Sequence, residues 1–269
     1  MLAFSARMFK DKFKTFLIYS VSAIGLLEMY IVLFPAIRKQ AGQFEQILKT
    51  FPPDIFKAMN MDSTSMSFST LESYLSTEYM SFLWPILAIV FAISMANYIF
   101  ANELDKGTIE TLLSLPAKRI KIFFERYFTG LALIAGFCAF SILSAMMLAQ
   151  LHNIDYIYNN FLTTTIGSFM FMWGVYSLGV LLTVIFSEKG RSTMATSGVL
   201  ILMYVLNIIS SLNTDLENLR YLSFFNYFNG SELLAKNIFP EYMFIAFGCA
   251  ILLTTIFATV RFSKRDLSV

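Results

Sequence analysis

The sequence predicts an all-α membrane protein with six transmembrane helices, and three observations support this. Of the 269 residues, 57% are hydrophobic and only 14% are charged, and the mean hydropathy is +0.65. A soluble globule of this composition would expose large apolar patches. Six stretches also reach the roughly 20 apolar residues that a helix needs to cross about 30 Å of hydrocarbon. Lastly, the basic residues are concentrated on one side of these stretches.

The predicted transmembrane domain covers residues 15–260. Its six spans are residues 15–37, 79–101, 128–150, 162–186, 194–212 and 241–260. Of the 20 Lys and Arg residues, 14 lie in the termini and the connections on their side, and six lie in the connections opposite. By the positive-inside rule, this bias places both termini in the cytoplasm, with residues 261–269 as a cytoplasmic tail.

Residues 1–14 precede the first span, and their pattern predicts an amphipathic interfacial helix. Phe4, Met8, Phe9 and Phe13 recur at short helical spacings, with basic residues between them. A helix of this kind lies in the headgroup plane with its aromatic side toward the lipid. A plain basic flank that orients the span is the alternative. A cleaved signal peptide is not expected, because the apolar run is too long and contains Glu28.

The two larger outer loops, residues 38–78 and 213–240, carry helical patterns of their own. In the first, an apolar stripe that includes Phe44 and Ile47 predicts a short amphipathic helix on the outer leaflet. In the second, dense aromatic residues indicate re-entrant or interfacial helices. A helix start is expected at Asn229, ahead of Leu233 and Leu234.

Several function classes find no support in the sequence. Cys138 and Cys249 lie in apolar runs without metal-ligand spacing, and His152 has only Asp155 nearby. An intramembrane enzyme would need catalytic side chains at the same depth in two spans, such as two acids, a His and a Glu, or a Ser and a Lys. No such partner for Glu28 is expected in another span. A net charge of +2 also argues against a nucleic-acid partner. We therefore expect no catalytic residue, no metal ligand and no cofactor-binding residue in this chain.

The connection between the second and third spans, residues 103–116, has the pattern of a docking element. It is too charged for lipid, and its apolar residues fall on one side of a helix while its charged residues fall on the other. Asp105 lies near the positive end of the helix dipole, and Pro116 ends the pattern. A soluble partner could bind here. An interfacial helix that only links two spans is the open alternative.

These residues carry a family resemblance. The string Glu103…Gly107-Thr108-Ile109-Glu110…Leu112-Leu113-Ser114-Leu115-Pro116…Arg119 resembles the signature of ABC transporter permeases of the type 2 exporter class. Residues 261–267 are similar to that family's ending, and with the six spans the resemblance covers nearly the whole chain. There are two departures. Arg126 stands where the family often has Lys, and the first outer loop is larger than in minimal members, which bears on the substrate.

The resemblance implies that residues 103–116 form the coupling helix, seated on a separate ATP-binding cassette ATPase present in two copies. The implied contact residues are Glu103, Leu104, Asp105, Gly107, Thr108, Glu110, Thr111, Leu112, Leu113, Leu115, Pro116 and Arg119. The chain has no Gly-x-x-x-x-Gly-Lys-Ser/Thr loop, so ATP and Mg²⁺ would be bound by the ATPase. A second permease chain, identical or related, would complete the membrane part. The expected location is the inner membrane of a prokaryote, among membrane lipids.

Polar residues within the spans are candidates for the substrate path, because such groups normally face protein or water. Glu28 could meet a cationic substrate, or it could be paired near the outer headgroups. Asn97 and Asn207 could line the path or bond a neighbouring helix. The small residues in the spans are expected to permit close helix packing. They are Gly130, Gly136, Gly167, Gly174 and Gly179.

For the exported substrate, the many Met and Phe side chains suit an amphipathic or antimicrobial peptide, although they also suit ordinary lipid-facing core. A lipid or lipid-linked glycan ranks second and a drug-like molecule third. A membrane anchor for a signalling complex that transports nothing is the alternative from another class. A stand-alone channel or carrier is disfavoured, because the two three-span halves show no internal repeat.

Overall fold

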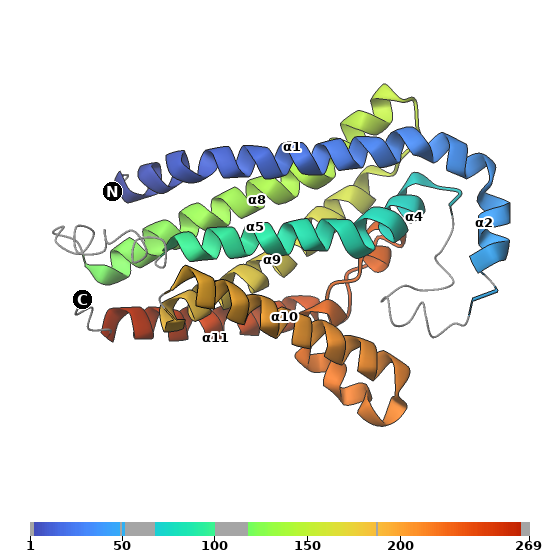
Figure 1. The fold of residues 1–269 in the computed structure, drawn as a ribbon. Helices are drawn as coiled ribbons and strands as arrows, with labels where there is room; N and C mark the ends of the chain where they lie inside the picture. Colours follow the sequence, from blue (N-terminus) through green and yellow to red (C-terminus); the bar gives the residue numbers. More distant parts are fainter. Residues whose placement is uncertain (1–2, 49, 52–67, 100–117, 187, 265–269) are drawn as a thin grey trace.

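The computed structural model describes residues 3–48, 50–51, 68–99, 118–186 and 188–264. Of the residues that the structure describes, 88% are helical, and six helices among them are long and apolar enough to cross a membrane. The predicted fold class, an all-α membrane protein, is confirmed. The long helices lie side by side, and both chain termini lie at one end of the bundle, here called the terminal end (Figure 1). The opposite end is called the distal end.

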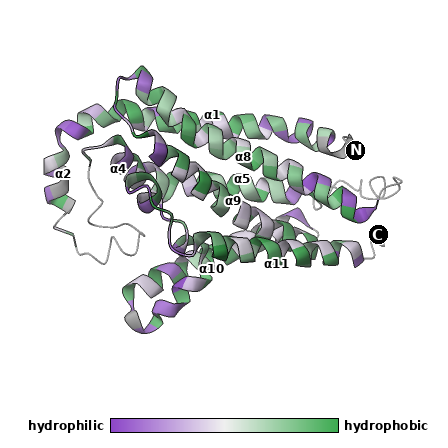
Figure 2. Cartoon of the chain, turned by 180° about the vertical axis from the view of Figure 1, so that it is seen from behind, coloured by the Kyte–Doolittle hydropathy of each residue, from purple (hydrophilic) through white to green (hydrophobic). Residues whose placement is uncertain are grey.

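Five of the six spans are single helices, and the second span is a run of three consecutive helices. They are α1 (Ala3–Lys39), α4 with η1 and α5 (Leu71–Leu75, Ser76–Leu83, Trp84–Ile99), α8 (Arg119–Leu151), α9 (Tyr158–Phe186), α10 (Lys189–Leu212) and α11 (Met243–Lys264). Hydrophobic residues cover most of their length, and hydrophilic residues gather toward the two ends of the bundle (Figure 2). α9 packs against α5, α8, α10 and α11, whereas α1 packs mainly on α8. The core of the bundle is therefore built around α9.

The N-terminal segment differs from its prediction as a separate interfacial helix. α1 is one helix of 37 residues, so the described part of residues 1–14 continues the first span. The sequence between Ala6 and Ala23 contains no Gly or Pro that would break it. A helix of this length extends about 55 Å, well beyond the hydrocarbon thickness. Its charged first turns therefore project past the spanning part at the terminal end.

The second span begins earlier than its hydropathy predicts. Thr70 caps α4, accepting a hydrogen bond from Ser73 N at 3.3 Å, so the helix starts at Leu71 and not near residue 79. The first outer loop is correspondingly shorter, and it contains α2 (Ala41–Leu48). Residues 52–67 of that loop lie outside the described part. Hydropathy marks the buried length of a helix and does not detect polar turns that continue it.

The second outer loop contains three short helices: η2 (Thr214–Leu222), η3 (Phe224–Asn226) and η4 (Ser231–Ala235). The predicted helix start at Asn229 is confirmed, because its side chain accepts hydrogen bonds from Ser231 N and Glu232 N. Phe228 is buried and stacks on Phe171 and Trp84, with ring centroids 4.6 and 5.7 Å apart. The loop thus enters the bundle between α5 and α9.

Close helix packing at the glycines is confirmed. A Cβ built on Gly130, Gly167, Gly174 or Gly179 would lie under 3.0 Å from a side-chain atom of another helix, and one on Gly136 would lie 3.3 Å from the Phe16 ring. Small residues let neighbouring backbones or aromatic rings approach, which is how helices associate tightly in lipid. Gly179 lets α9 approach α5, Gly174 lets it approach α11, and Gly130 lets α8 approach α9.

A hydrogen-bonded group joins α8, α9 and α11 in the middle of the bundle. The Tyr127 hydroxyl lies 2.7 Å from Ser177 Oγ and 3.1 Å from Thr255 Oγ1, and it accepts a bond from Trp173 Nε1 at 2.8 Å. Polar groups inside a membrane bundle need such partners because no water replaces them. One phenolic oxygen therefore connects three helices.

Replacing Tyr127 with Phe is expected to lower the free energy of unfolding by about 1–2 kcal/mol, since it removes the shared hydroxyl and keeps the ring. Thermal unfolding in detergent measures this in a Cys249→Ser background, with labelling of the buried Cys138 thiol as the signal. Tyr158→Phe, at an exposed position in the first turn of α9, is the matched control. Equal midpoints for the two variants would contradict the prediction.

Candidate functional site

Of the residues predicted to contact the ATPase, the described part of the chain includes only the last, Arg119. Arg119 is the first residue of α8, directly after the cap residue Lys118. The other predicted contacts, from Glu103 to Pro116, lie outside the described residues. The structure does define where the segment is attached, because the chain leaves α5 after Ile99 and rejoins the described part at Lys118.

The last turn of α5 is held by a charged cluster that we call the α5-end cluster: Asp11, Lys12, Ser94, Tyr98 and Arg126. Lys12 Nζ donates to Ser94 Oγ at 3.3 Å and lies 5.2 Å from the centroid of the Tyr98 ring. The Tyr98 hydroxyl donates to the carboxylate of Asp11. The charged first turns of α1 are thereby attached to the end of α5.

Arg126 reaches the same point from α8. Its side chain is only 2% exposed, and its Nη1 atom donates to the carbonyl oxygen of Ile99 at 3.0 Å and to that of Tyr98 at 3.4 Å. Its Cζ atom lies 5.7 Å from the Tyr98 ring centroid. These carbonyl oxygens supply the buried guanidinium with hydrogen-bond partners in place of water, which a charge inside the protein requires.

Asn97 belongs to a second polar cluster, beside the first. Its Nδ2 donates to Thr193 Oγ1 at 2.8 Å, and its Oδ1 accepts from Thr183 Oγ1 at 3.1 Å. Thr183 Oγ1 also lies 2.7 Å from Ser192 Oγ. Asn97 is 3% exposed. These bonds join α5, α9 and the start of α10, which is the helix-bonding alternative stated for Asn97.

Glu28 has a partner that sequence reasoning did not anticipate. Its Oε1 atom lies 2.8 Å from Nε2 of His152, at the end of α8, and the two side chains are 38% and 34% exposed. His152 follows the last residue of α8 and lies outside the predicted spans, so the pair, separated by 124 positions, corresponds to the paired alternative stated for Glu28. The pair ties α1 to α8 near the distal end. Among the described residues, no group of three or more acidic, His or Cys side chains could hold a metal ion.

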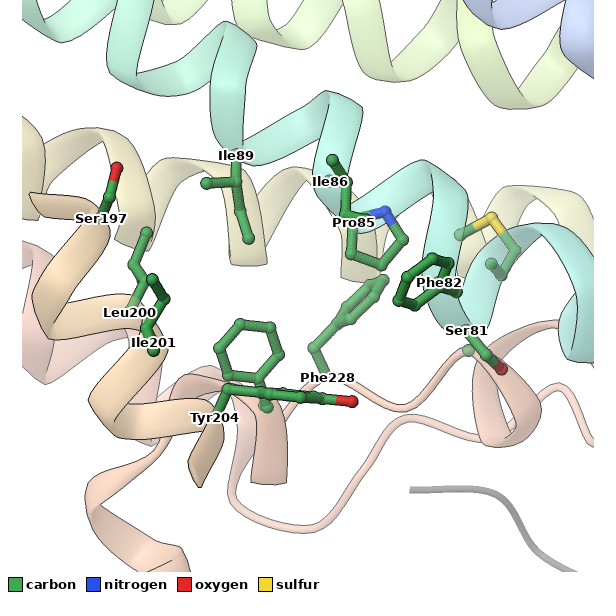
Figure 3. Close-up of a pocket in the computed structure, with 13 residues that line it drawn as sticks. Ser81, Phe82, Pro85, Ile86, Ile89, Ser197, Leu200, Ile201, Tyr204 and Phe228 are labelled. Carbon is green, nitrogen blue, oxygen red and sulfur yellow. The ribbon is translucent and has the colours of Figure 1, made fainter. Parts of the chain in front are cut away.

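An apolar groove of about 300 Å³ lies between α5 and α10. One wall comes from η1 and α5, the other comes from α10, and the outer loop closes the distal side. The lining residues are Met80, Ser81, Phe82, Pro85, Ile86, Ile89, Ser197, Leu200, Ile201, Tyr204, Phe225, Phe228 and Gly230. Figure 3 shows Leu200 and Tyr204 across the groove from Ile86 and Ile89. Two serine hydroxyls and one phenol are the only polar side-chain groups in this lining.

Local packing explains how the groove keeps its shape. A Cβ on Gly230 would lie 2.9 Å from the Cβ of Met80, so the outer loop can approach η1 only because this residue is a glycine. Ile86 and Ile201 on the two walls are 46% and 63% exposed, whereas Leu200 and Phe228 are buried. The groove is therefore a depression in an apolar face that no other described helix covers.

The three predicted path residues, Glu28, Asn97 and Asn207, do not line this groove. Asn207 is 4% exposed on α10. The groove and the α5-end cluster were both missed by sequence reasoning. The sequence signal for the cluster was Arg126, a basic residue two positions before the predicted third span, which was counted as a topological charge.

The six spanning helices define a multi-pass membrane protein, with a charged cluster at the terminal end and an apolar groove between α5 and α10. The family model described as ABC-2 family transporter protein matches residues 13–267. The chain belongs to this family and is a transporter permease subunit, which is not itself catalytic and whose family works with an ATPase. No curated protein and no solved structure matches the chain.

Proposed function

We propose that this chain is the membrane subunit of an ATP-driven exporter, which moves its substrate outward by alternating access while a separate subunit hydrolyses ATP. The observation that supports this most strongly is the family match over all six spans in a chain that has no phosphate-binding loop. The terminal end of the bundle, with both termini, faces the cytoplasm in this proposal. The membrane is the inner membrane of a prokaryote.

The working complex contains two ATPase subunits, which bind ATP and Mg²⁺, and a second permease chain, identical or related. ATP closes the ATPase subunits together and displaces the two coupling segments. The spans then rock between an inward-open and an outward-open packing, as rigid bodies do in other two-state proteins. ATP favours one packing and departure of the substrate favours the other, so hydrolysis drives the cycle.

The groove between α5 and α10 supports an amphipathic substrate. Its walls are apolar, and Tyr204 and Ser81 offer hydroxyl groups to a polar part of the same molecule. An amphipathic or antimicrobial peptide ranks first as the exported substrate. Lipids, lipid-linked glycans and drug-like molecules share the apolar chemistry and form the comparison set, with the same mechanism.

The test is co-purification with the ATPase subunit encoded in the neighbouring genes. The double variant Gly107→Leu, Glu110→Lys is expected to lower the amount of co-purified ATPase about tenfold or more, because bulk and a reversed charge are placed in the contact helix. Glu217→Lys, an exposed charge reversal in η2 at the distal end, is the control and should retain the ATPase. Undiminished co-purification in the double variant would exclude residues 103–116 as the docking element.

Transport must also be separated from anchoring. In liposomes, a transporter should show ATP hydrolysis stimulated by at least one member of a panel of amphipathic peptides, lipids and drug-like molecules. A complex that binds the ATPase and responds to no member of the panel would favour the membrane anchor. A response to lipids with none to any peptide would reverse the order of the two substrate classes.

A further inference from the structure

The side chains around Tyr98 form a joint between three helices. Two cations lie over the Tyr98 ring, Lys12 Nζ at 5.2 Å and Arg126 Cζ at 5.7 Å from its centroid, and the Tyr98 hydroxyl donates to Asp11. Each cation comes from a different helix, α1 or α8. Cations over an aromatic face are attracted to it, most strongly where water is excluded. The last described turn of α5 is therefore held by side chains from two other helices.

Arg126 makes this joint rigid. A guanidinium presents its donors in a planar fork, and here one nitrogen bonds two successive carbonyl oxygens at the end of α5 while the group packs on Tyr98. A buried charge is costly to desolvate, and it persists only where surrounding groups fix it. Any movement of the α5 end relative to α8 must break these bonds.

The position of the joint relates it to the coupling segment. Tyr98 is the second-to-last described residue of α5, from which the chain enters residues 100–117, and Arg126 lies on α8, with which the described chain resumes. Both helices that flank the segment are thus bound to each other at its point of attachment. A displacement applied to the segment would reach α1, α5 and α8 together.

We propose that Arg126 and Tyr98 are positioning residues that transmit the ATPase-driven displacement of the coupling segment to the spans, by making the terminal ends of α1, α5 and α8 move as one body. This inference depends on the proposed function, because it requires an ATPase that acts on residues 103–116. Neither residue touches nucleotide. Without the joint, the rate of ATP hydrolysis should be unchanged, but ATP should no longer cause a conformational change at the distal end.

The experiment follows both quantities in the assembled permease–ATPase complex in lipid nanodiscs. In a Cys249→Ser background, Leu212→Cys carries an environment-sensitive fluorophore; Leu212 is 51% exposed at the distal end of α10, and Cys138 is buried. The measured quantities are the rate of ATP hydrolysis and the change in emission when a non-hydrolysable ATP analogue is added. The variants are Arg126→Met, Arg126→Lys and Tyr98→Leu.

We expect Arg126→Met and Tyr98→Leu to reduce the emission change about fivefold, with the hydrolysis rate changed by less than about twofold, since residues in a coupling element alter linkage by this order. Arg126→Lys should restore at least about half of the emission change, because it keeps the buried cation. Thr129→Val is the matched control, as the Thr129 hydroxyl bonds the Glu125 carbonyl within α8 itself. It should change neither quantity.

A full emission change in Arg126→Met, or a loss in proportion to hydrolysis, would overturn the proposal in favour of a purely structural role. Should Arg126→Met fail to assemble, Lys12→Met and Tyr98→Leu keep the buried cation and serve for the same comparison. Failure of the parent protein to bind any ATPase would instead overturn the proposed function, and the two failures are therefore distinguishable.

Discussion

Replacing Gly179 with valine is expected to destabilise the folded protein by about 3 kcal/mol, the largest stability change of any single substitution considered for this chain. Gly179 lies on α9 where the helix crosses α5. A Cβ at this position would lie 2.9 Å from the Cβ of Ala96 and 3.7 Å from Thr196 Cγ2. Valine adds two further methyl groups to this already closed contact.

The contact cannot relax by a side-chain rotation, because the opposing atom is a Cβ attached directly to the α5 backbone. The same addition at Gly174 would meet the movable ring of Phe247, at 2.7 Å. At Gly179 the two helices themselves must separate. That displacement also stretches the bond from Thr183 to Asn97, which lie one turn along α9 and one residue along α5. Overpacking and the weakened bond therefore act together.

Thermal unfolding of the purified protein in detergent, compared with the unaltered chain, measures the loss. Gly198→Val provides the control, since it makes the same exchange in the interior of a spanning helix where no other atom lies within 4 Å of the new Cβ. The control separates steric conflict from any change in helix propensity. If both variants unfold at the same temperature, the close approach of α9 to α5 is not what stabilises this part of the bundle.

Filling the groove is expected to have the largest effect on transport. The double variant Ser197→Trp, Ile201→Trp places two indole rings on the α10 wall, inside a volume of about 300 Å³. Stimulation of ATP hydrolysis by amphipathic peptides should fall about tenfold or more, because overfilling a binding volume costs on the order of 1–3 kcal/mol. Basal hydrolysis should remain, since the groove lies away from the α5-end cluster.

Leu202→Trp is the matched control for the groove. Leu202 follows Ile201 on α10 and is 58% exposed, but it does not line the groove. The assay measures ATP hydrolysis in liposomes over a range of peptide concentrations, for the unaltered chain, the groove variant and Leu202→Trp. Equal stimulation in the groove variant and in Leu202→Trp would show that the substrate binds elsewhere, and Glu28 and Asn207 would then be the next positions to test.

Predictions from the sequence were most accurate for properties that depend only on the composition of a single segment. The apolar stretches predicted six spanning helices, because burial of each helix in lipid requires only its own composition. The family signature predicted the permease class. Predicted boundaries were less accurate: α1 and the second span both continue past their apolar parts, since polar turns such as those after Thr70 remain helical beyond the lipid.

Pairings between distant residues show where such reasoning ends. His152 was judged from its neighbour Asp155, whereas its hydrogen-bond partner is Glu28 on another helix. Asn97 was considered for the substrate path, and its contacts instead join three helices. Tyr127 was not singled out, although its hydroxyl bonds groups on α9 and α11. A polar residue in a span signals that a partner exists, but its spacing does not identify that partner.

The sequence by itself determined that this chain has six spanning helices and a charged connection after the second, because composition and local periodicity decide whether a segment enters the membrane. The permease class came from the resemblance of that connection to a family signature. Only the tertiary structure decided that Arg126 bonds the Ile99 carbonyl of α5, that Glu28 contacts His152 and that a groove is left between α10 and α5. These features depend on how helices rotate and cross. In lipid, that choice is made by close packing and interhelical hydrogen bonds, and hydropathy does not encode either one.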